Sequence, residues 1–351
     1  MPNHDWMAGF SNRDDLTLVD VTFPGSHDAG LQEAEGGFSG YTPVASRADT
    51  ICQFYDIKGQ LEVGSRAFDL RIAKQGNVLR TFHGEGNPLA LAGGGWGQGA
   101  ISIFEQVDDF LRVHTGEIVI LRISHSSEKD QIHNQVRASI AASRLYRAGP
   151  RNIAAVPLSQ LRGKAIVIFD AKALGTTDPL NGLHRFSKFG SVSEGLPICG
   201  SYAGQFAGTL TGNQMMREMT QVALDCGNDH GGHARSLSGK HDHIFMVYWQ
   251  LAWNVKDKSV NTGAARDRGL TKLDDTKGTH YNLDYLFNAH RGALPMYHVT
   301  LNPKVGFKTK VSTTVTTGTR LWHRPNWINL DFVNDEACGK VIEFNNELLP
   351  G

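Results

Sequence analysis

Short, nearly uninterrupted apolar runs restrict the fold of this 351-residue sequence more than any other feature. The stretches Ile118-Val119-Ile120-Leu121 and Ala165-Ile166-Val167-Ile168-Phe169 contain only apolar side chains. Runs of this kind are typical of parallel strands that are buried on both faces. Eight segments rich in Val, Ile and Phe are therefore predicted to be strands: Leu18–Pro24, Arg66–Ile72, Val78–His83, Glu117–Ser124, Lys164–Asp170, Pro197–Tyr202, Ile244–Ala252 and Trp327–Val333.

Segments with helical character separate several of the predicted strands. They are Ile101–His114, Lys129–Arg147, Asn213–Asp225 and Asn282–Ala293. Strands that alternate with covering helices predict an α/β barrel. We therefore expect a single, somewhat irregular (β/α)8 TIM-type barrel with loop insertions, as one domain over 1–351 with its core at about 16–345. The Gly-rich stretch 84–99 is expected to be a long loop, and 304–320 a loop or a hairpin outside the barrel.

The charge balance and the cysteines narrow the class of protein. The chain carries 35 Lys and Arg residues against 35 Asp and Glu residues, with a pI near 7.3. No bulk charge therefore attracts it to nucleic acid, and we expect no nucleic-acid partner. No apolar run is long enough to span a bilayer, and the first ten residues lack the apolar centre of a signal peptide. The four cysteines lie far apart without a CxxC pair, which leaves disulfides open and disfavours a zinc knuckle.

Charged and imidazole side chains recur near the ends of the predicted strands, where an α/β barrel carries its functional residues. Asp69 and Arg71 are two residues apart on one strand, so they point to the same face. Opposite charges inside a barrel are costly unless they pair or bind a ligand. The side chains expected to meet at one rim of the barrel are His27, Asp28, Asp69, Arg71, His83 and Asp331.

Two histidines, three carboxylates and one arginine form a set that is suited to phosphoryl transfer. One imidazole removes a proton from an attacking hydroxyl, the other protonates the leaving oxygen, and each transfer contributes about 10²–10⁴-fold. Carboxylates fix the tautomer of an imidazole, and an arginine binds phosphate through its planar fork. Structural alternatives exist for each residue, since His83 could pack, Asp69 and Arg71 could form a stabilising ion pair, and Asp331 could cap a helix.

Three blocks of the sequence, in this order, resemble the X domain of phosphatidylinositol-specific phospholipase C, particularly the bacterial single-domain enzymes. They are Phe23–Asp28, Gln60–Arg71 and His83-Gly84. Further matches lie at Leu161–Ile168 and at Trp327–Glu343. The resemblance covers most of the chain. It implies an irregular (β/α) barrel and an intramolecular phosphotransfer.

The resemblance also implies catalytic roles. His27 resembles the general base that takes a proton from the inositol 2-hydroxyl, and His83 resembles the general acid that protonates the diacylglycerol oxygen. Asp331 resembles the carboxylate that orients the base, and Asp28 the one that pairs with the acid. The implied products are diacylglycerol and inositol 1,2-cyclic phosphate, with slower hydrolysis to inositol 1-phosphate.

The resemblance bears on the metal requirement as well. Asp69 and Arg71 resemble the pair that binds and polarises the phosphate. Calcium-dependent members of the family hold Ca²⁺ near the phosphate with carboxylates, whereas an arginine takes the place of the metal in the metal-free bacterial branch. Because Arg71 matches that arginine, we expect no metal and no other cofactor.

The positions expected to bind the head group match the family less well. Arg122 lies where a basic residue is expected to bind the inositol ring, and Tyr202 matches a ring-stacking tyrosine. Lys172 lies near the fifth strand, where the expected arginine is missing, and Gly200 replaces an expected acidic residue. Trp249 is expected to lie in the core or the pocket wall. Phosphodiester cleavage is therefore better supported than inositol as the head group.

Two other functions compete with this interpretation. One is a phosphodiesterase for a different head group, such as glycerophosphodiesters, although such enzymes usually need a divalent metal in a Glu-rich site. The other is a catalytically silent lipid-binding module, which would not need both an acid and a base. The histidine-rich segment 229–243 also suggests either a metal site or a polar loop.

Partners and location follow only loosely from the residues. We expect a monomer with a phosphoinositide lipid as substrate and transient binding at a membrane interface. Trp96, with Leu89 and Leu91, could either insert into a bilayer or pack over the rim of the barrel. A secreted or extracellular protein is expected, with a cytoplasmic location or export without a cleaved leader as alternatives.

Overall fold

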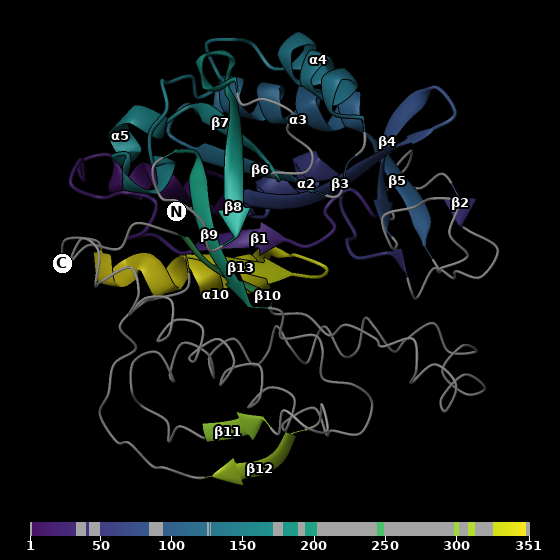
Figure 1. Ribbon diagram of the computed structural model, residues 1–351. Coiled ribbons are helices and arrows are strands. Elements are labelled where there is room, and N and C mark those ends of the chain that lie inside the picture. The colour runs from purple at the N-terminus through teal and green to yellow at the C-terminus, as the bar shows by residue number, and fades with distance from the viewer. Residues whose placement is uncertain are drawn as a thin grey trace.

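Eight parallel strands form the centre of the protein, which is described here from a computed structural model (Figure 1). The structure describes residues 2–32, 40–41, 50–83, 94–124, 126, 128–170, 178–188, 194–201, 244–248, 298–301, 308–312 and 326–348. The parallel strands are β1 (Phe23–Ser26), β3 (Ala67–Gln75), β6 (Ile118–Ser124), β7 (Lys164–Phe169), β8 (Leu183–Lys188), β9 (Leu196–Ser201), β10 (Ile244–Tyr248) and β13 (Trp327–Leu330).

The order of these strands is that of a TIM-barrel-like α/β fold. Hydrogen bonding runs β1-β13-β10-β9-β8-β7-β6-β3, and β3 also pairs with β1 over two residues, Gly25 with Ala67 and Ser26 with Phe68. The expected TIM-type fold is therefore confirmed in this coarser form. The sheet as a whole is mixed and continues past β3, so it is not a regular (β/α)8 barrel.

The predicted third barrel strand is instead part of an antiparallel extension. Strand β4 (Val78–His83) pairs antiparallel with β3, and β5 (Gly95–Gly99) and β2 (Gly40–Tyr41) follow it, beside the barrel in Figure 1. Only Gly76 and Asn77 separate β3 from β4, and Gly76 has a φ of 60°. A connection this short makes a hairpin, because parallel strands need a crossover of a dozen residues or more.

The eighth barrel strand is one that the sequence pattern missed. Strand β8, with the sequence LHRFSK, lies between β7 and β9 and pairs parallel with both. Its polar residues hide the apolar signal on which strand prediction depends. The other seven predicted strands overlap the observed barrel strands.

Helices of unequal length accompany the strands. They are α2 (Ile57–Glu62), α3 (Ala100–Val113), α4 (Lys129–Ser139), α5 (Leu158–Leu161) and α10 (Asp335–Glu343), with 3-10 helices η1 (Asn3–Phe10), η2 (Ile153–Ala155), η3 (Pro179–Asn181) and η5 (Phe344–Leu348). Helix α3 agrees with its prediction, whereas α4 ends eight residues before the predicted Arg147. The helices expected at Asn213–Asp225 and Asn282–Ala293 lie outside the described residues.

Alternate residues of the strands serve two separate cores. One core contains Ala67, Ile120 and Ile166 together with η1, and so fills the interior of the barrel. The other contains Phe68, Leu70, Val119 and Val167 together with the buried side of α3, so it lies between the strands and the helices. Asp69, Arg71 and Arg122 share the alternation of Ala67 and Ile120, which directs them to the interior.

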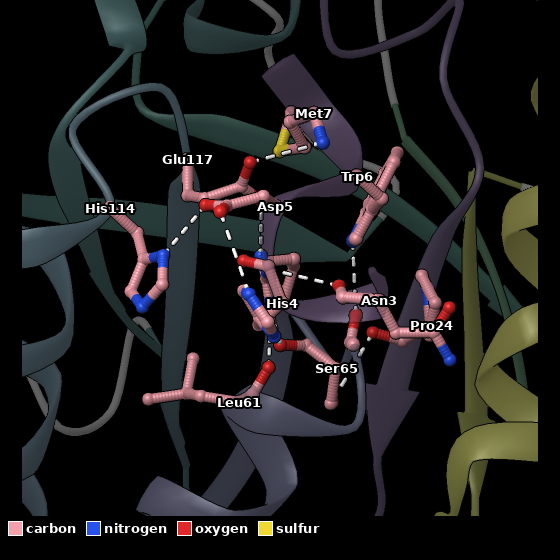
Figure 2. Close-up of polar contacts among 12 residues, drawn as sticks. Asn3, His4, Asp5, Trp6, Met7, Pro24, Leu61, Ser65, His114 and Glu117 are labelled. Atoms are coloured by element: carbon pink, nitrogen blue, oxygen red, sulfur yellow. Dashed lines mark hydrogen bonds and ion pairs between the residues drawn. The ribbon is translucent and has the colours of Figure 1, made fainter. Parts of the chain in front are cut away.

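The N-terminal segment closes the interior core at one end. Figure 2 shows Asp5 accepting a hydrogen bond of 2.6 Å from Nδ1 of His114, and the backbone N–H of Met7 donating to Oε1 of Glu117 at 3.0 Å. The other oxygen of Glu117 accepts a 2.7 Å hydrogen bond from Nε of Arg66. Both Arg66 and Glu117 are fully buried, and carbonyls of Leu61 and Ser65 accept further bonds from the guanidinium.

Glu117→Gln should destabilise the protein by about 3–5 kcal/mol, because it leaves the Arg66 charge buried without its counter-charge. The free energy of unfolding in urea measures this. Asp109→Asn is the matched control, since Asp109 pairs with Arg112 while both side chains are more than half exposed, and it should change nothing measurable. Equal stabilities for the two variants would contradict the importance of the buried pair.

A separate two-stranded sheet lies in the second half of the chain. Strand β11 (His298–Leu301) pairs antiparallel with β12 (Lys308–Ser312). Of the segment 304–320, where a loop or a hairpin was expected, the structure describes only 308–312, and the partner strand β11 lies before that segment. No helix in the described part of the chain has both the length and the apolar character needed to cross a membrane.

Candidate active site

The turn after β1 carries His27 and Asp28 into the rim. The N–H of His27 donates to the carbonyl of Leu330 at 3.0 Å, and the N–H of Ala29 donates to the carbonyl of Asp69 at 3.0 Å. The turn is thereby fixed to both neighbouring strands. Asp28 has a φ of 42°, in the left-handed region that Asp and Asn tolerate better than other side chains.

Asp331 follows β13 and contacts His27. Its Oδ1 lies 2.8 Å from Nδ1 of His27, and both side chains are buried. A carboxylate accepts, so Nδ1 carries the proton and Nε2 is left to exchange one. Asn334 rather than Asp331 caps helix α10, since its side chain accepts from the N–H of Ala337 at 2.8 Å. The capping alternative for Asp331 is therefore wrong.

Gln53 clamps the two loops that carry His27 and Asp331. Its Nε2 donates to the carbonyls of His27 at 2.9 Å and Leu330 at 3.0 Å, while its Oε1 accepts from the N–H of Val333 at 3.0 Å. Next to the clamp, Phe332 has a φ of 51°, an unusual conformation for a large side chain, and its N–H donates to the carbonyl of Cys52 at 2.6 Å. The carboxylate of Asp331 is thus held in one place by its neighbours.

His83 reaches the same site from the end of β4. Its Nδ1 lies 2.5 Å from Oδ2 of Asp28, and Nε2 of His27 lies 3.4 Å from that same oxygen. One carboxylate oxygen therefore lies between the two imidazoles. Arg71 adds a permanent cation, with its Nε 3.3 Å from Oδ1 of Asp28.

The carboxylates control the charge of both imidazoles. Burial by itself would lower the pKa of His27, but the negative charges of Asp28 and Asp331 outweigh burial and hold that pKa well above its usual value. Burial would also lower the pKa of His83. The charge and the hydrogen bond of Asp28 outweigh burial there and raise that pKa to about 9. In turn, Arg71, His27 and His83 overcome the effect of burial on Asp28 and keep its pKa well below the usual range.

Asp69 and Arg122 form a second buried pair in the barrel interior. Nη1 of Arg122 donates to Oδ1 of Asp69 at 2.7 Å, and the guanidinium also stacks 4.7 Å from the ring centre of Phe186. Asp69 also lies near His27 and Asp28. The structure thus pairs Asp69 with Arg122 and places Arg71 beside Asp28.

All six predicted rim residues and Arg122 meet in the described structure. The predicted head-group residues Lys172, Tyr202 and Trp249 lie outside the described residues, as does the histidine-rich segment 229–243. Trp96 lies on β5, and its ring is 4.7 Å from that of Phe82 on β4, which agrees with packing beside the rim.

Two residues near His27 and His83 had no signal in the sequence. Gln53 provides the clamp described above. Cys52 is fully buried, and its thiol lies within 4.8 Å of ligand atoms of His27 and Asp331, and likewise of Asp28 and His83. No motif contains them, and they approach the histidines only through folding. An alternation or spacing rule could not have found them.

The pKa shifts predict an alkaline displacement of the pH–rate profile. Acid–base catalysis needs His27 neutral and His83 protonated, so the rate rises with pH as His27 loses its proton and falls as His83 loses its proton. Because both pKa values are raised, the bell-shaped profile of kcat/KM should be displaced to alkaline pH, and the limb that reports His83 should lie near pH 9. A profile measured on a short-chain soluble substrate tests this. An alkaline limb near the ordinary imidazole pKa of about 6.5 would contradict the inferred role of Asp28.

The fold is shared with known bacterial enzymes. Phosphatidylinositol-specific phospholipase C from Listeria monocytogenes superposes with a TM-score of 0.57 and 14% identity over 98% of this chain and 99% of that one. A mutant of the Staphylococcus aureus enzyme superposes with a TM-score of 0.55 and 13% identity over 98% of each chain. A third structure is of the S. aureus enzyme and concerns the modulation of its membrane binding. It superposes with a TM-score of 0.55 and 14% identity over 98% of each chain. No protein-family model and no curated protein sequence matches the chain. At these identities the likeness establishes the fold alone.

Proposed function

We propose that this protein is a phospholipase C that cleaves phosphatidylinositol to diacylglycerol and inositol 1,2-cyclic phosphate. The observation that carries the proposal is the arrangement of His27 and His83 around one oxygen of Asp28, at 3.4 Å and 2.5 Å. Two imidazoles with separate carboxylate partners, His27 buried and His83 about one-quarter exposed, are suited to act as a base and an acid in one reaction. The shared fold with enzymes of this name makes the phosphodiester of an inositol lipid the best-supported substrate.

The first step is an attack within the substrate. The inositol 2-hydroxyl forms a bond to phosphorus while its proton passes to Nε2 of His27. The bond between phosphorus and the diacylglycerol oxygen breaks, and His83 gives that oxygen a proton. After this step His27 is protonated and His83 is neutral. Each imidazole is therefore ready for the reverse role when water opens the cyclic phosphate.

Carboxylates assist both proton transfers. Asp331 holds Nδ1 of His27 at 2.8 Å and stabilises the imidazolium that forms when His27 accepts the proton. Asp28 holds Nδ1 of His83 and keeps that ring protonated before the reaction, consistent with a pKa of about 9.

Arg71 is proposed to stabilise the phosphate in place of a metal. Its guanidinium lies beside Asp28, and its side chain is about one-fifth exposed, so a bound phosphate can reach it. A planar fork of N–H donors stabilises the charge that builds on the non-bridging oxygens. The proposed reaction therefore needs no divalent cation.

The protein is proposed to bind its lipid substrate at a membrane surface. One of the solved structures of the S. aureus enzyme that share this fold concerns the modulation of its membrane binding. Here Trp96, partly exposed beside Phe82 and two strands from the body of the barrel, is an aromatic residue next to Gly95, which pairs with His83. Trp and similar side chains favour the interfacial layer of a bilayer.

A panel of head groups in the presence of EDTA tests the proposed function. Vesicles of phosphatidylinositol, phosphatidylcholine and phosphatidylglycerol, and soluble glycerophosphoinositol, are each incubated with the chelated protein. We expect turnover of phosphatidylinositol, with release of diacylglycerol. Turnover of another diester alone would change the substrate and keep the chemistry. Turnover only after Ca²⁺ is added would overturn the role of Arg71.

A further inference from the structure

A thiol lies among the catalytic groups, where the acid–base mechanism does not use it. Cys52 belongs to two overlapping groups of side chains whose ligand atoms lie within 4.8 Å of one another. The first group is His27, Cys52 and Asp331, and the second is Asp28, Cys52 and His83. The first group is the better buried, since His27, Cys52 and Asp331 are 7%, 0% and 1% exposed.

The three members of the first group come from segments that are fixed to one another. The N–H of Cys52 donates to the carbonyl of Leu31 at 2.9 Å, and its carbonyl accepts from the N–H of Phe332 at 2.6 Å. Gln53 bonds to the carbonyls of His27 and Leu330. The backbone therefore presents the sulfur, the imidazole and the carboxylate together, before any ligand arrives.

The donor set determines the kind of ligand. Imidazole nitrogen, thiolate sulfur and carboxylate oxygen are the three ligand types of tetrahedral zinc, whereas Mg²⁺ and Ca²⁺ prefer oxygen alone. Metal–ligand distances of about 2.0–2.3 Å place two tetrahedral ligands roughly 3.3–3.7 Å apart. Atoms already within 4.8 Å need to close by only about 1–1.5 Å. The charge of Asp28 next to this group also favours a cation.

We propose that His27, Cys52 and Asp331 bind a thiophilic divalent cation such as zinc, and that this binding inhibits the enzyme. The inhibitory part rests on the proposed function, whereas the binding part does not. The nitrogen of His27 that faces Asp331 is Nδ1, so the cation takes the Nδ1 lone pair and the one proton left on the imidazole is held at Nε2, where the substrate proton would otherwise be accepted. The thiol proton, and the second imidazole proton where His27 is doubly protonated, leave to solvent. A bound cation therefore removes the base from the reaction.

Cobalt binding tests the site without using activity. Co²⁺ replaces zinc in such sites, and a cobalt–thiolate bond gives an intense sulfur-to-metal absorption band in the near ultraviolet. Chelator-treated full-length protein is titrated with Co²⁺ as wild type, Cys52→Ser and Cys338→Ser, with Cys52→Ala as a second variant if the serine variant does not fold. Cys338 is the matched control because it is also fully buried but lies on α10.

The expected result separates the two cysteines. Wild type and Cys338→Ser should show the band, and Zn²⁺ should displace Co²⁺ from both, while Cys52→Ser should lose the band. Zinc inhibition, scored against the metal-free rate of each variant, should need at least about tenfold more zinc in Cys52→Ser. Equal concentrations of Ca²⁺ or Mg²⁺ should leave the rate of every variant unchanged.

Two outcomes overturn the proposal, and neither is confused with failure of the proposed function. A band of the same strength in Cys52→Ser, arising from another cysteine, removes Cys52 from the site. A wild type that turns over substrate but shows no band has no such site. If no inositol lipid is cleaved while the band depends on Cys52, the binding site stands and only the proposed function and its inhibition fail.

Discussion

Replacing either His27 or His83 by alanine should lower kcat/KM by about 10²–10⁴-fold while the fold stays intact. Each variant loses one of the two proton transfers, and the remaining imidazole cannot carry out both in one step. The double variant should be little slower than the slower single variant, because groups that act as a unit are not additive. Initial rates on phosphatidylinositol in mixed micelles measure these losses.

The control for this pair is another buried histidine. His133 lies on α4, is 9% exposed and packs its ring 4.6 Å from that of Phe169. His133→Ala should reduce stability through the lost packing and leave kcat unchanged. If His27→Ala or His83→Ala kept near-normal rates, the assignment of that histidine would be wrong. Similar losses of kcat in all three variants would point to unfolding rather than catalysis.

Asp28→Asn should be about as harmful as the loss of a histidine, with a rate reduction on the order of 10²–10⁴-fold. Its carboxylate contacts His83, His27 and Arg71 at once, so one amide removes the negative charge that all three share. Asparagine is the informative substitution because it tolerates the φ of 42° at this position. Alanine would add backbone strain to the loss of charge.

The pH dependence of Asp28→Asn distinguishes an electrostatic role from a structural one. In Asp28→Asn, the negative charge that outweighs the effect of burial on His83 is gone. The pKa of His83 therefore falls, and the limb of kcat/KM that reports His83 moves below pH 9. Asp108→Asn is the control, because Asp108 lies on α3, outside the site, and forms an ion pair of 2.5 Å with Arg144. This variant should leave the pH profile unchanged. An unshifted limb in Asp28→Asn would contradict the proposed electrostatic control.

Those parts of the site that depend on local patterns were predictable from the sequence. The two-residue spacing of Asp69 and Arg71 correctly predicted a common face, because alternation along a strand is a local property. The apolar runs around Ile120 and Val167 correctly predicted buried parallel strands. The expectation that strand ends gather His27, Asp28 and Asp331 also held, since parallel strands of one barrel end at the same rim.

The pairing of strands and charges was less accessible, because it is set by segments far apart in the chain. Val78–His83 has the composition of a barrel strand, and only the two-residue connection at Gly76 reveals the hairpin. His83 nevertheless reaches Asp28, because β4 follows the edge of β3 toward the rim. The partner of Asp69 is Arg122, from the neighbouring strand, where register rather than sequence spacing decides the contact.

Isolated residues in connecting segments were not predictable at all. Cys52 and Gln53 precede helix α2 in a stretch without a motif, and Gln53 bonds to the carbonyl of Leu330, 277 positions away. Their importance arises from tertiary contacts with two loops at once. This is also why the proposed cation site at Cys52 had no trace in the cysteine spacing.

A substrate whose leaving group needs no proton tests the central assignment of base and acid most directly. In an inositol phosphodiester whose leaving group is 4-nitrophenol, that group departs as the phenolate. Its departure does not require the proton of His83. We predict that His83→Ala regains most of its lost rate on this substrate relative to phosphatidylinositol, whereas His27→Ala regains none. Equal losses for the two variants on both substrates would contradict the division of roles between these histidines.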